Sequence, residues 1–281
     1  MSVAPKFSIH LTNGRSDILI SKNSIYRLIS AKGLESGDYD IFSSANSQLH
    51  GASVISRRIK PRRITLEFEA DGGEFSRSDL ISFFNPLLDG TLTVTREANV
   101  RSIKYIPEKA EFSQPTLFDP LCIKATLYCA APFFTNPRDT AVSNKTSVPM
   151  LTFPFTSIKG VGITSGLEIS ANTFSISNPG DVDVGISVTL RAQGRVVNPY
   201  VASNGREIRI LDKIEEGDVY EICTVPGSKS LVKNGVNVFN FDRKSDFFTL
   251  SPGISSVVIG ADVGADLIYS DIVYNVKYLG I

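Results

Sequence analysis

The stretch RRIKPRRITLEFEADGGEFSRSDLISFFNPLLDGTLTVT, residues 57–95, predicts a strand, a short helix and a second strand in close succession. Between residues 64 and 70 every second residue is apolar, which is the pattern of a strand with one buried face. Residues 91–95 start a second strand after the Asp89-Gly90 turn, and residues 123–129 repeat the alternation. This order of elements predicts a mainly β domain.

The short helix is predicted to run from about Ser76 to Asn85. The hydroxyl of Ser76 is suited to accept a hydrogen bond from a free amide of the first turn. Leu80, Ile81 and Phe84 would then share one face of the helix and pack on the sheet. The helix should end where the chain meets a proline, because the residue before a proline disfavours the helical region.

Five basic residues crowd the start of the quoted stretch, whereas the whole chain carries 29 acidic and 29 basic residues. Proteins that bind duplex nucleic acid usually carry a basic excess, because each phosphate contact needs a cation. The cluster has three interpretations: a solvated or subunit-facing strand edge, a nucleic-acid contact, or a partner-binding patch. Charges on an edge strand prevent unwanted strand pairing, which favours the first interpretation. The cluster comprises Arg57, Arg58, Lys60, Arg62 and Arg63.

The length of 281 residues and the hydrophobic content of 42% predict two packed domains. A polar, proline-bounded connector lies at residues 135–150, and we place the boundary after residue 140. Frequent turn signals between short strands in residues 178–253 are typical of a sandwich or jelly roll. No stretch is apolar enough to span a bilayer, and the first residues do not resemble a signal peptide. The last strand is predicted to present one face through Ile272, Tyr274, Val276 and Tyr278.

The three cysteines are predicted to be buried free thiols. Seven residues of strand would separate Cys122 from Cys129 by roughly 23 Å, far beyond the ~7 Å that a disulfide allows between α-carbons. Cys223 is then left without a counterpart. Free thiols agree with assembly in a reducing cytoplasm.

Short motifs follow one another in a fixed order along the first half of the chain. They are Lys32-Gly33-Leu34, Asn46 with Gln48 and Gly51, Pro61-Arg62-Arg63-Ile64, Leu80 to the Phe84-Asn85-Pro86 turn, Gly90-Thr91-Leu92, and Pro132-Phe133-Phe134. In this order and spacing the sequence resembles the distal tail proteins (Dit) of long-tailed, siphovirus-type phages of Gram-positive bacteria. In the second half the resemblance is less specific and rests on residues 178–181 and the Gly217-Asp218 turn.

The resemblance implies a mainly β fold with two β-sandwich-type domains. Residues 1–140 would be a ring-forming, tail-tube-like domain with one short helix and a long extended excursion. Residues 141–281 would be a peripheral galectin-like, jelly-roll sandwich. It also implies a structural protein of the virion tail tip, encoded by a phage, a prophage or a tail-like bacteriocin and assembled in the bacterial host cytoplasm.

The implied function is a baseplate hub in which six copies form a ring. One ring face would contact the tail tube protein, and the other would contact the tail-tip hub that carries a fibre or lysin. The second domains would support receptor-binding proteins during host attachment. The resemblance implies no specific nucleic-acid partner and no membrane partner.

A closed ring needs contacts between two different faces of each copy, and free strand edges can supply the hydrogen bonds for them. We expect exposed strands at residues 57–70 and in the segment 101–120 to make these contacts. The second segment is either an arm that reaches a neighbour or an excursion along the surface. The candidate interface residues are Arg57, Arg58, Lys60, Arg62, Arg63, Pro107, Pro115 and Pro120.

The sequence predicts no enzyme activity, no cofactor and no metal. The two histidines, His10 and His50, stand in polar surroundings, and we interpret both as solvated surface residues. HExxH, GxSxG and GxxxxGK motifs are absent from the sequence. Residues 181–185 resemble part of a calcium loop, but the later glutamate ligand is missing.

The alternative function is a host-surface module whose second domain binds cell-wall carbohydrate. Sugar platforms use exposed aromatic faces, and this chain contains no tryptophan. Tyr200, Tyr220 or Tyr269 would have to provide the platform. The simpler interpretation of each tyrosine is a buried or interface residue.

Overall fold

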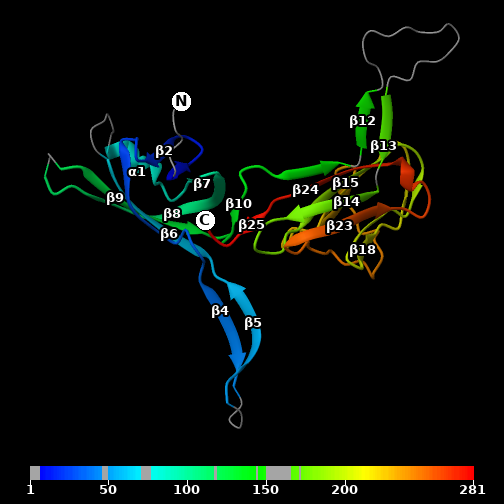
Figure 1. Ribbon diagram of the computed structural model, residues 1–281, viewed down its shortest axis with the longest axis horizontal. Coiled ribbons are helices and arrows are strands. Elements are labelled where there is room, and N and C mark those ends of the chain that lie inside the picture. Colours follow the sequence, from blue (N-terminus) through cyan, green and yellow to red (C-terminus); the bar gives the residue numbers. More distant parts are fainter. Residues whose placement is uncertain are drawn as a thin grey trace, which may run out of the picture. The chain divides into compact units, whose positions relative to one another are not determined.

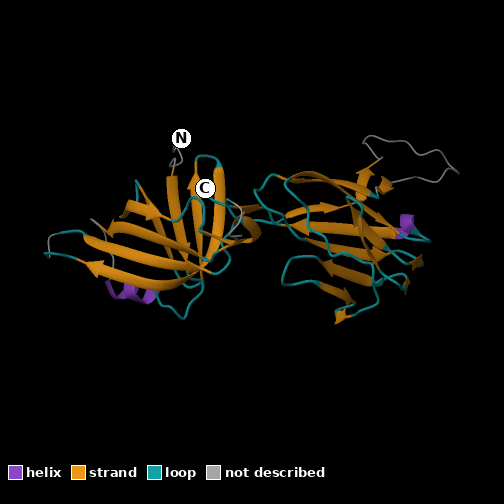
Figure 2. Cartoon of the chain, turned by 90° about the horizontal axis from the view of Figure 1, so that it is seen from below, coloured by secondary structure: helices purple, strands orange, loops and turns teal. Residues whose placement is uncertain are grey.

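The computed structural model describes residues 7–45, 50–70, 77–116, 119–143, 145–149, 166–170 and 172–281. The chain forms two compact units (Figure 1). Unit 1 contains Met1–Pro137 together with Lys277–Ile281, and unit 2 contains Arg138–Val276. Strands make up most of both units, which confirms the mainly β fold (Figure 2).

The main sheet of unit 1 closes on itself. Its strands follow the order β7-β1-β2-β3-β6-β9, and β8 pairs with both outer members of this row. The first half of β8 pairs with β7, and the second half pairs with β9 after an irregularity between Pro107 and Lys109. One long strand therefore closes the sheet into a barrel. The strands are β1 (Phe7–Thr12), β2 (Asp17–Ser21), β3 (Tyr26–Lys32), β6 (Arg62–Ala70), β7 (Gly90–Arg96), β8 (Asn99–Ser113) and β9 (Leu121–Cys129).

The core of unit 1 comes from the alternation that the sequence predicts. The inward residues of β6 stand opposite those of β9, as in the pairs Leu66–Ala125 and Phe68–Ile123. All four are buried, because side chains of alternate residues point to the same face of a strand. Cys129 is a buried free thiol as predicted, whereas the free thiols of Cys122 and Cys223 are only half-buried.

Helix α1 (Arg77–Phe83) covers part of this core (Figure 2). Leu80 and Phe84 are buried as expected, but the side chain of Ile81 is 53% exposed. Phe83 is buried in its place and meets Phe84 edge to face at 5.0 Å between ring centroids. The buried face is therefore rotated from the predicted one. The predicted cap, Ser76, lies outside the described residues.

The last residues of the sequence return to unit 1, although residues 141–281 were expected to form one domain. β10 (Phe134–Thr135) pairs with β8, and β25 (Lys277–Tyr278) pairs with β10 (Figure 1). The predicted last strand is split, because β24 ends at Tyr274 in unit 2 and β25 belongs to unit 1. Unit 2 is thus inserted between two neighbouring strands of unit 1. We call Lys277–Ile281 the return segment.

A buried arginine secures the return segment. Arg62 is 3% exposed, and its guanidinium donates hydrogen bonds to the carbonyls of Gly33 (3.0 Å), Glu35 (2.6 Å) and Leu279. The guanidinium also lies over the ring of Phe134, 5.0 Å from its centroid. Burial lowers the pKa of Arg62, but an arginine keeps its charge in a protein interior. Four separate parts of unit 1 therefore meet at one cation.

Further contacts strengthen this attachment. Arg101 donates to the carbonyl of Gly280 and lies 3.7 Å from the ring centroid of Tyr278. The amide of Ile281 donates to the carbonyl of Leu34 at 3.1 Å. The return segment is therefore bonded along its whole length rather than at one point.

Unit 2 contains two antiparallel sheets with buried inner faces. One sheet has the order β11-β24-β15-β20-β21-β22 and the other has the order β14-β23-β17-β18. Val188 and Leu190 of the first sheet and Val257 and Ile259 of the second are buried. The first sheet contains β11 (Thr140–Ser143), β24 (Ile268–Tyr274), β15 (Ile186–Ala192), β20 (Val219–Cys223), β21 (Ser230–Lys233) and β22 (Val236–Asn237). The second contains β14 (Thr173–Asn178), β23 (Gly253–Gly260), β17 (Tyr200–Ser203) and β18 (Arg206–Arg209).

Three smaller elements complete unit 2. β16 (Val196–Val197) pairs with β19 (Lys213–Ile214), and β12 (Lys145–Pro149) pairs with β13 (Gly166–Ser170). A short 3-10 helix, η1 (Ala265–Leu267), precedes β24. These elements extend unit 2 without adding a further large sheet to the described residues.

Replacing Arg62 with methionine should destabilise unit 1 by about 3 kcal/mol, because buried carbonyl groups lose their charged donor. The matched control is Arg63→Met, at the next position of β6. Arg63 is exposed and forms a surface ion pair with Glu108, so this change should cost less than about 1 kcal/mol. Urea unfolding of both variants measures the difference. Equal costs would contradict the role given to Arg62.

Candidate assembly surface

A β-hairpin projects from unit 1 and is the candidate assembly surface. It consists of β4 (Tyr39–Ser44) and β5 (Ser53–Ile59), which pair with each other and with no other described strand (Figure 1). The outer edges of both strands therefore carry unpaired backbone groups, which can accept a further strand. We call this hairpin the arm.

One face of the arm is apolar apart from a single cation. Tyr39 stands opposite Ile59, and Ile41 stands opposite Arg57, so these four side chains share one face. Tyr39 and Ile41 are exposed, with 65% of Ile41 accessible. A set of large apolar side chains exposed together on a single chain marks an interaction site.

The opposite face of the arm carries Phe42, which is 48% exposed, beside charges that pair with one another. Asp40 forms ion pairs with Arg58 and Lys60, each with a nitrogen-to-oxygen distance of 2.8 Å. Arg58 also lies over the ring of Phe42. The hydrogen bonds from Lys60 and Arg58 lower the pKa of Asp40. Arg58 and Lys60 are thus paired, whereas Arg57, the third cation at the arm, has no partner among the described residues. The apolar face with Arg57 is therefore the face that a partner would cover.

The predicted basic cluster is divided by the structure. Arg57, Arg58 and Lys60 are exposed on the arm or at its base. Arg62 is buried, so it cannot face a neighbouring subunit, and the reason is its bonding to three carbonyls inside unit 1. Arg63 is exposed and forms a two-pronged ion pair with Glu108.

Of the exposed strand edges expected at residues 57–70 and 101–120, those of residues 57–59 lie in β5 of the arm, whereas residues 62–70 form the paired strand β6. β6 is paired along its length with β9 and over most of it with β3, whereas β8 pairs mainly with β7 in its first half and with β9 alone in its second half. Most of the segment 101–120 is therefore a strand of the barrel, and not an arm or a surface excursion. Pro107 is buried at the irregularity of β8, Pro115 is exposed and Pro120 is half-buried.

The arm itself was not predicted from the sequence, although a weak signal exists. Two stretches of β-favouring residues, 39–42 and 53–56, flank a polar segment that contains Gly51. That is the spacing of a hairpin. The signal is weak because a strand exposed on both faces has no alternation between buried and solvated positions.

In unit 2 the three candidate sugar tyrosines do not present free faces. Tyr220 is fully buried. Arg209 lies 4.7 Å from the ring centroid of Tyr200, and Arg191 lies 5.6 Å from that of Tyr269. Among the described residues of unit 2, the exposed aromatic side chain is Phe239, which is 86% accessible and was not singled out from the sequence.

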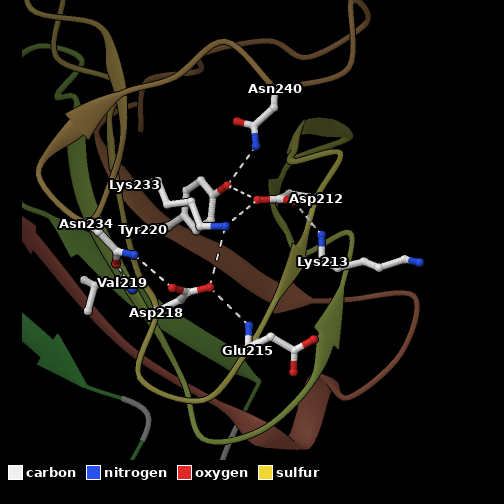
Figure 3. Close-up of polar contacts among 9 residues, drawn as sticks. All are labelled: Asp212, Lys213, Glu215, Asp218, Val219, Tyr220, Lys233, Asn234 and Asn240. Carbon is white, nitrogen blue, oxygen red and sulfur yellow. Dashed lines mark hydrogen bonds and ion pairs between the residues drawn. The ribbon is translucent and has the colours of Figure 1, made fainter.

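Tyr220 belongs to a polar network that joins neighbouring loops and strands (Figure 3). Its hydroxyl donates to Asp212 at 2.6 Å and accepts a hydrogen bond from Asn240 at 2.8 Å. Lys233 contacts Asp212 at 2.7 Å and Asp218 at 3.5 Å. Burial and the bond to Asp212 raise the pKa of Tyr220 to about 12. Burial alone would raise the pKa of Asp212, but the bonds from Lys233 and Tyr220 outweigh it and lower that pKa.

The described residues contain no group of acidic, histidine or cysteine side chains that could hold a metal ion. His10 is partly exposed and contacts Asp17 at 3.1 Å, and His50 is exposed. Among the described helices, none has the length and apolar character needed to cross a membrane.

Comparison with known proteins identifies the fold. No family model and no curated protein matches the chain. The solved structure of the Dit protein of phage SPP1 matches 96% of this chain and 98% of its own, with a TM-score of 0.66 and 12% identity. The chain has the fold of a distal tail protein. This confirms at the level of fold the resemblance that the sequence motifs suggested.

A second solved structure covers a similar share of the chain. It is a chain of the phage p2 baseplate in its activated conformation with Sr, with a TM-score of 0.50 and 12% identity. It covers 98% of this chain and 99% of that one. The SPP1 protein is described as a paradigm of the hub adsorption apparatus in phages that infect Gram-positive bacteria.

The network around Asp212 predicts a pH dependence of stability. Because the folded-state pKa of Asp212 is lowered, its stabilisation is present above the unfolded-state pKa and is lost as the pH falls through the folded-state pKa. Asp212→Asn should therefore destabilise unit 2 by about 1–2 kcal/mol at pH 7. Urea titrations should show that the difference from wild type shrinks below about pH 4. A difference independent of pH would contradict the assignment.

Proposed function

We propose that this protein is a structural subunit of the hub at the distal end of a phage tail. Six copies form a ring through unit 1, and unit 2 lies at the periphery. The observation that carries the proposal is the arm, whose apolar face and strand edges are left uncovered by the described chain. The full-length likeness to the SPP1 Dit fold supports it.

A ring follows from this surface by elementary symmetry. A contact between two different patches on identical copies generates a ring when the rotation closes after a fixed number of copies. Burying the exposed apolar side chains of the arm provides the driving force. The free edges of the arm add directional hydrogen bonds that fix the rotation.

The remaining contacts of the hub follow from the two sides of such a ring. One side joins the tail tube protein, and the other joins the tail-tip hub with its fibre or lysin. Unit 2 carries receptor-binding proteins and thereby takes part in host attachment. The ring is assembled in the cytoplasm of the bacterial host and acts without enzymatic activity.

The arm is tested by a charge placed on its apolar face. Ile41→Asp should abolish the hexamer while changing the stability of the monomer by less than about 0.5 kcal/mol, since Ile41 is exposed. Leu87→Asp is the matched control, because Leu87 is 88% exposed on unit 1 outside the arm. Mass photometry, with and without the tail tube protein, measures the oligomer. A wild-type chain that stays monomeric in both conditions, or a hexamer that survives Ile41→Asp, would overturn the proposal.

A second candidate function is carbohydrate binding by unit 2, and Phe239 favours it. Phe239 borders an open groove of about 430 Å³. The lining residues include Ser228, Lys229, Ser230 and Asn237, and none of them is acidic. An exposed aromatic ring beside hydrogen-bonding groups suits a sugar ring, which has an apolar face and a polar rim.

This candidate predicts that the full chain binds purified cell-wall polysaccharide and that Phe239→Ala weakens binding at least tenfold. Val236→Ala is the control, because Val236 is also exposed but does not line the groove. Pull-down on immobilised polysaccharide measures binding. No binding by wild type, or equal binding by both variants, would exclude the groove.

A further inference from the structure

Unit 1 contains a groove beside the unpaired edge of β3. β2 and β3 are joined through a single parallel pair, Ile20 with Tyr26. One edge of β3 pairs with β6 from Tyr26 to Lys32. On the opposite edge, no described strand pairs with β3 beyond Tyr26. The barrel wall is therefore interrupted along residues 28–32. The groove at this interruption has a volume of about 850 Å³.

The groove has an apolar floor and charged walls. Phe7, Leu28, Ala31 and Ile281 line it, and all four are half-buried against the core of unit 1. The irregular register between Leu28 and Ser30 leaves the side chain of Ile29 exposed at the groove. The charged groups of the walls are Lys32, Glu35, Arg96 and Glu97.

Some charged side chains of the groove already have a hydrogen-bond partner, and others do not. Arg96 donates to the carbonyl of Ile281 at 3.4 Å. Glu35 and Glu97 are exposed and have no side-chain partner among the described residues. The groove thus offers an apolar floor, an open strand edge and two free carboxylates.

The arm matches the groove in each of these respects. Its apolar face carries Tyr39, Ile41 and Ile59, its strands have open edges, and its free cation is Arg57. Strand addition at an open edge supplies main-chain hydrogen bonds, and the alternate side chains enter the adjoining pocket. Arg57 would meet Glu35 or Glu97 at the wall.

The arm of the same copy does not line the groove. The arm begins shortly after β3 and projects away from the barrel of its own unit, so it leaves its own groove open (Figure 1). We propose that the arm of one copy adds to the open edge of β3 in the next copy and seats its apolar face in the groove. This inference rests on the proposed ring, and it names the two surfaces that build it.

Cysteine cross-linking tests the pairing in the full chain. The background variant replaces the half-buried Cys122 and Cys223 with serine and retains Cys129, whose burial raises the pKa of its thiol to about 12. Arg57→Cys places a thiol on the arm, and Ile29→Cys places one at the groove. Mixing the two variants with a short bismaleimide should give a covalent dimer. Neither variant alone should give one.

The matched control pairs the arm variant with Leu87→Cys, which lies outside the groove and should not cross-link. Charge reversal gives a second readout: Arg57→Glu should weaken assembly at least tenfold, and Glu35→Arg with Glu97→Arg should restore most of it. A ring in mass photometry without arm-to-groove cross-links would overturn this inference and leave the hub proposal intact. A chain that stays monomeric with the tail tube protein would overturn both.

Discussion

The buried guanidinium of Arg62 is the interaction on which the architecture depends. It bonds carbonyls at Gly33, Glu35 and Leu279 and covers the ring of Phe134. Three bonds to a charged donor offset the cost of removing that charge from water, and breaking such a set is expensive. A lysine would be a poor substitute, because its compact ammonium cannot reproduce the planar fork. Through Arg62 the return segment becomes part of unit 1, so unit 2 is tethered at both of its ends.

Closure of the barrel determines which surfaces remain for assembly. β6 is paired along its length with β9, and β8 pairs first with β7 and then with β9, so much of their backbone is already paired. The arm and the edge of β3 are among the described strand edges of unit 1 that stay open, and both lie close to the segment that Arg62 holds in place. Gly33 and Glu35 lie between β3 and the arm, so the same cation fixes the backbone at the base of both surfaces. The stability of the unit and its capacity to assemble are therefore linked.

Local periodicity predicted the parts of the fold that depend on neighbouring residues. The alternation at residues 64–70 and 123–129 gave β6 and β9, and the proline after Asn85 marked where the helical segment stops. The exposure of Ile81 instead of Phe83 depends on how α1 is rotated against the sheet, which local pattern does not determine. Arg62 looked like one member of a solvated basic run, because its carbonyl partners lie 27 to 217 residues away. The arm and the groove were not predicted either. The alternation of apolar and polar residues along one strand does not show which surface of another copy that strand would contact.

The central claim is that the return segment folds as part of unit 1. Native-state hydrogen exchange at increasing urea concentration tests it most directly, through the amide of Ile281, which donates to Leu34. We predict that this amide exchanges through the same global opening as the amide of Leu66 in the core of unit 1, so that the two protection free energies converge as urea rises. Exchange of the Ile281 amide at the rate of an exposed loop, while Leu66 stays protected, would contradict the account.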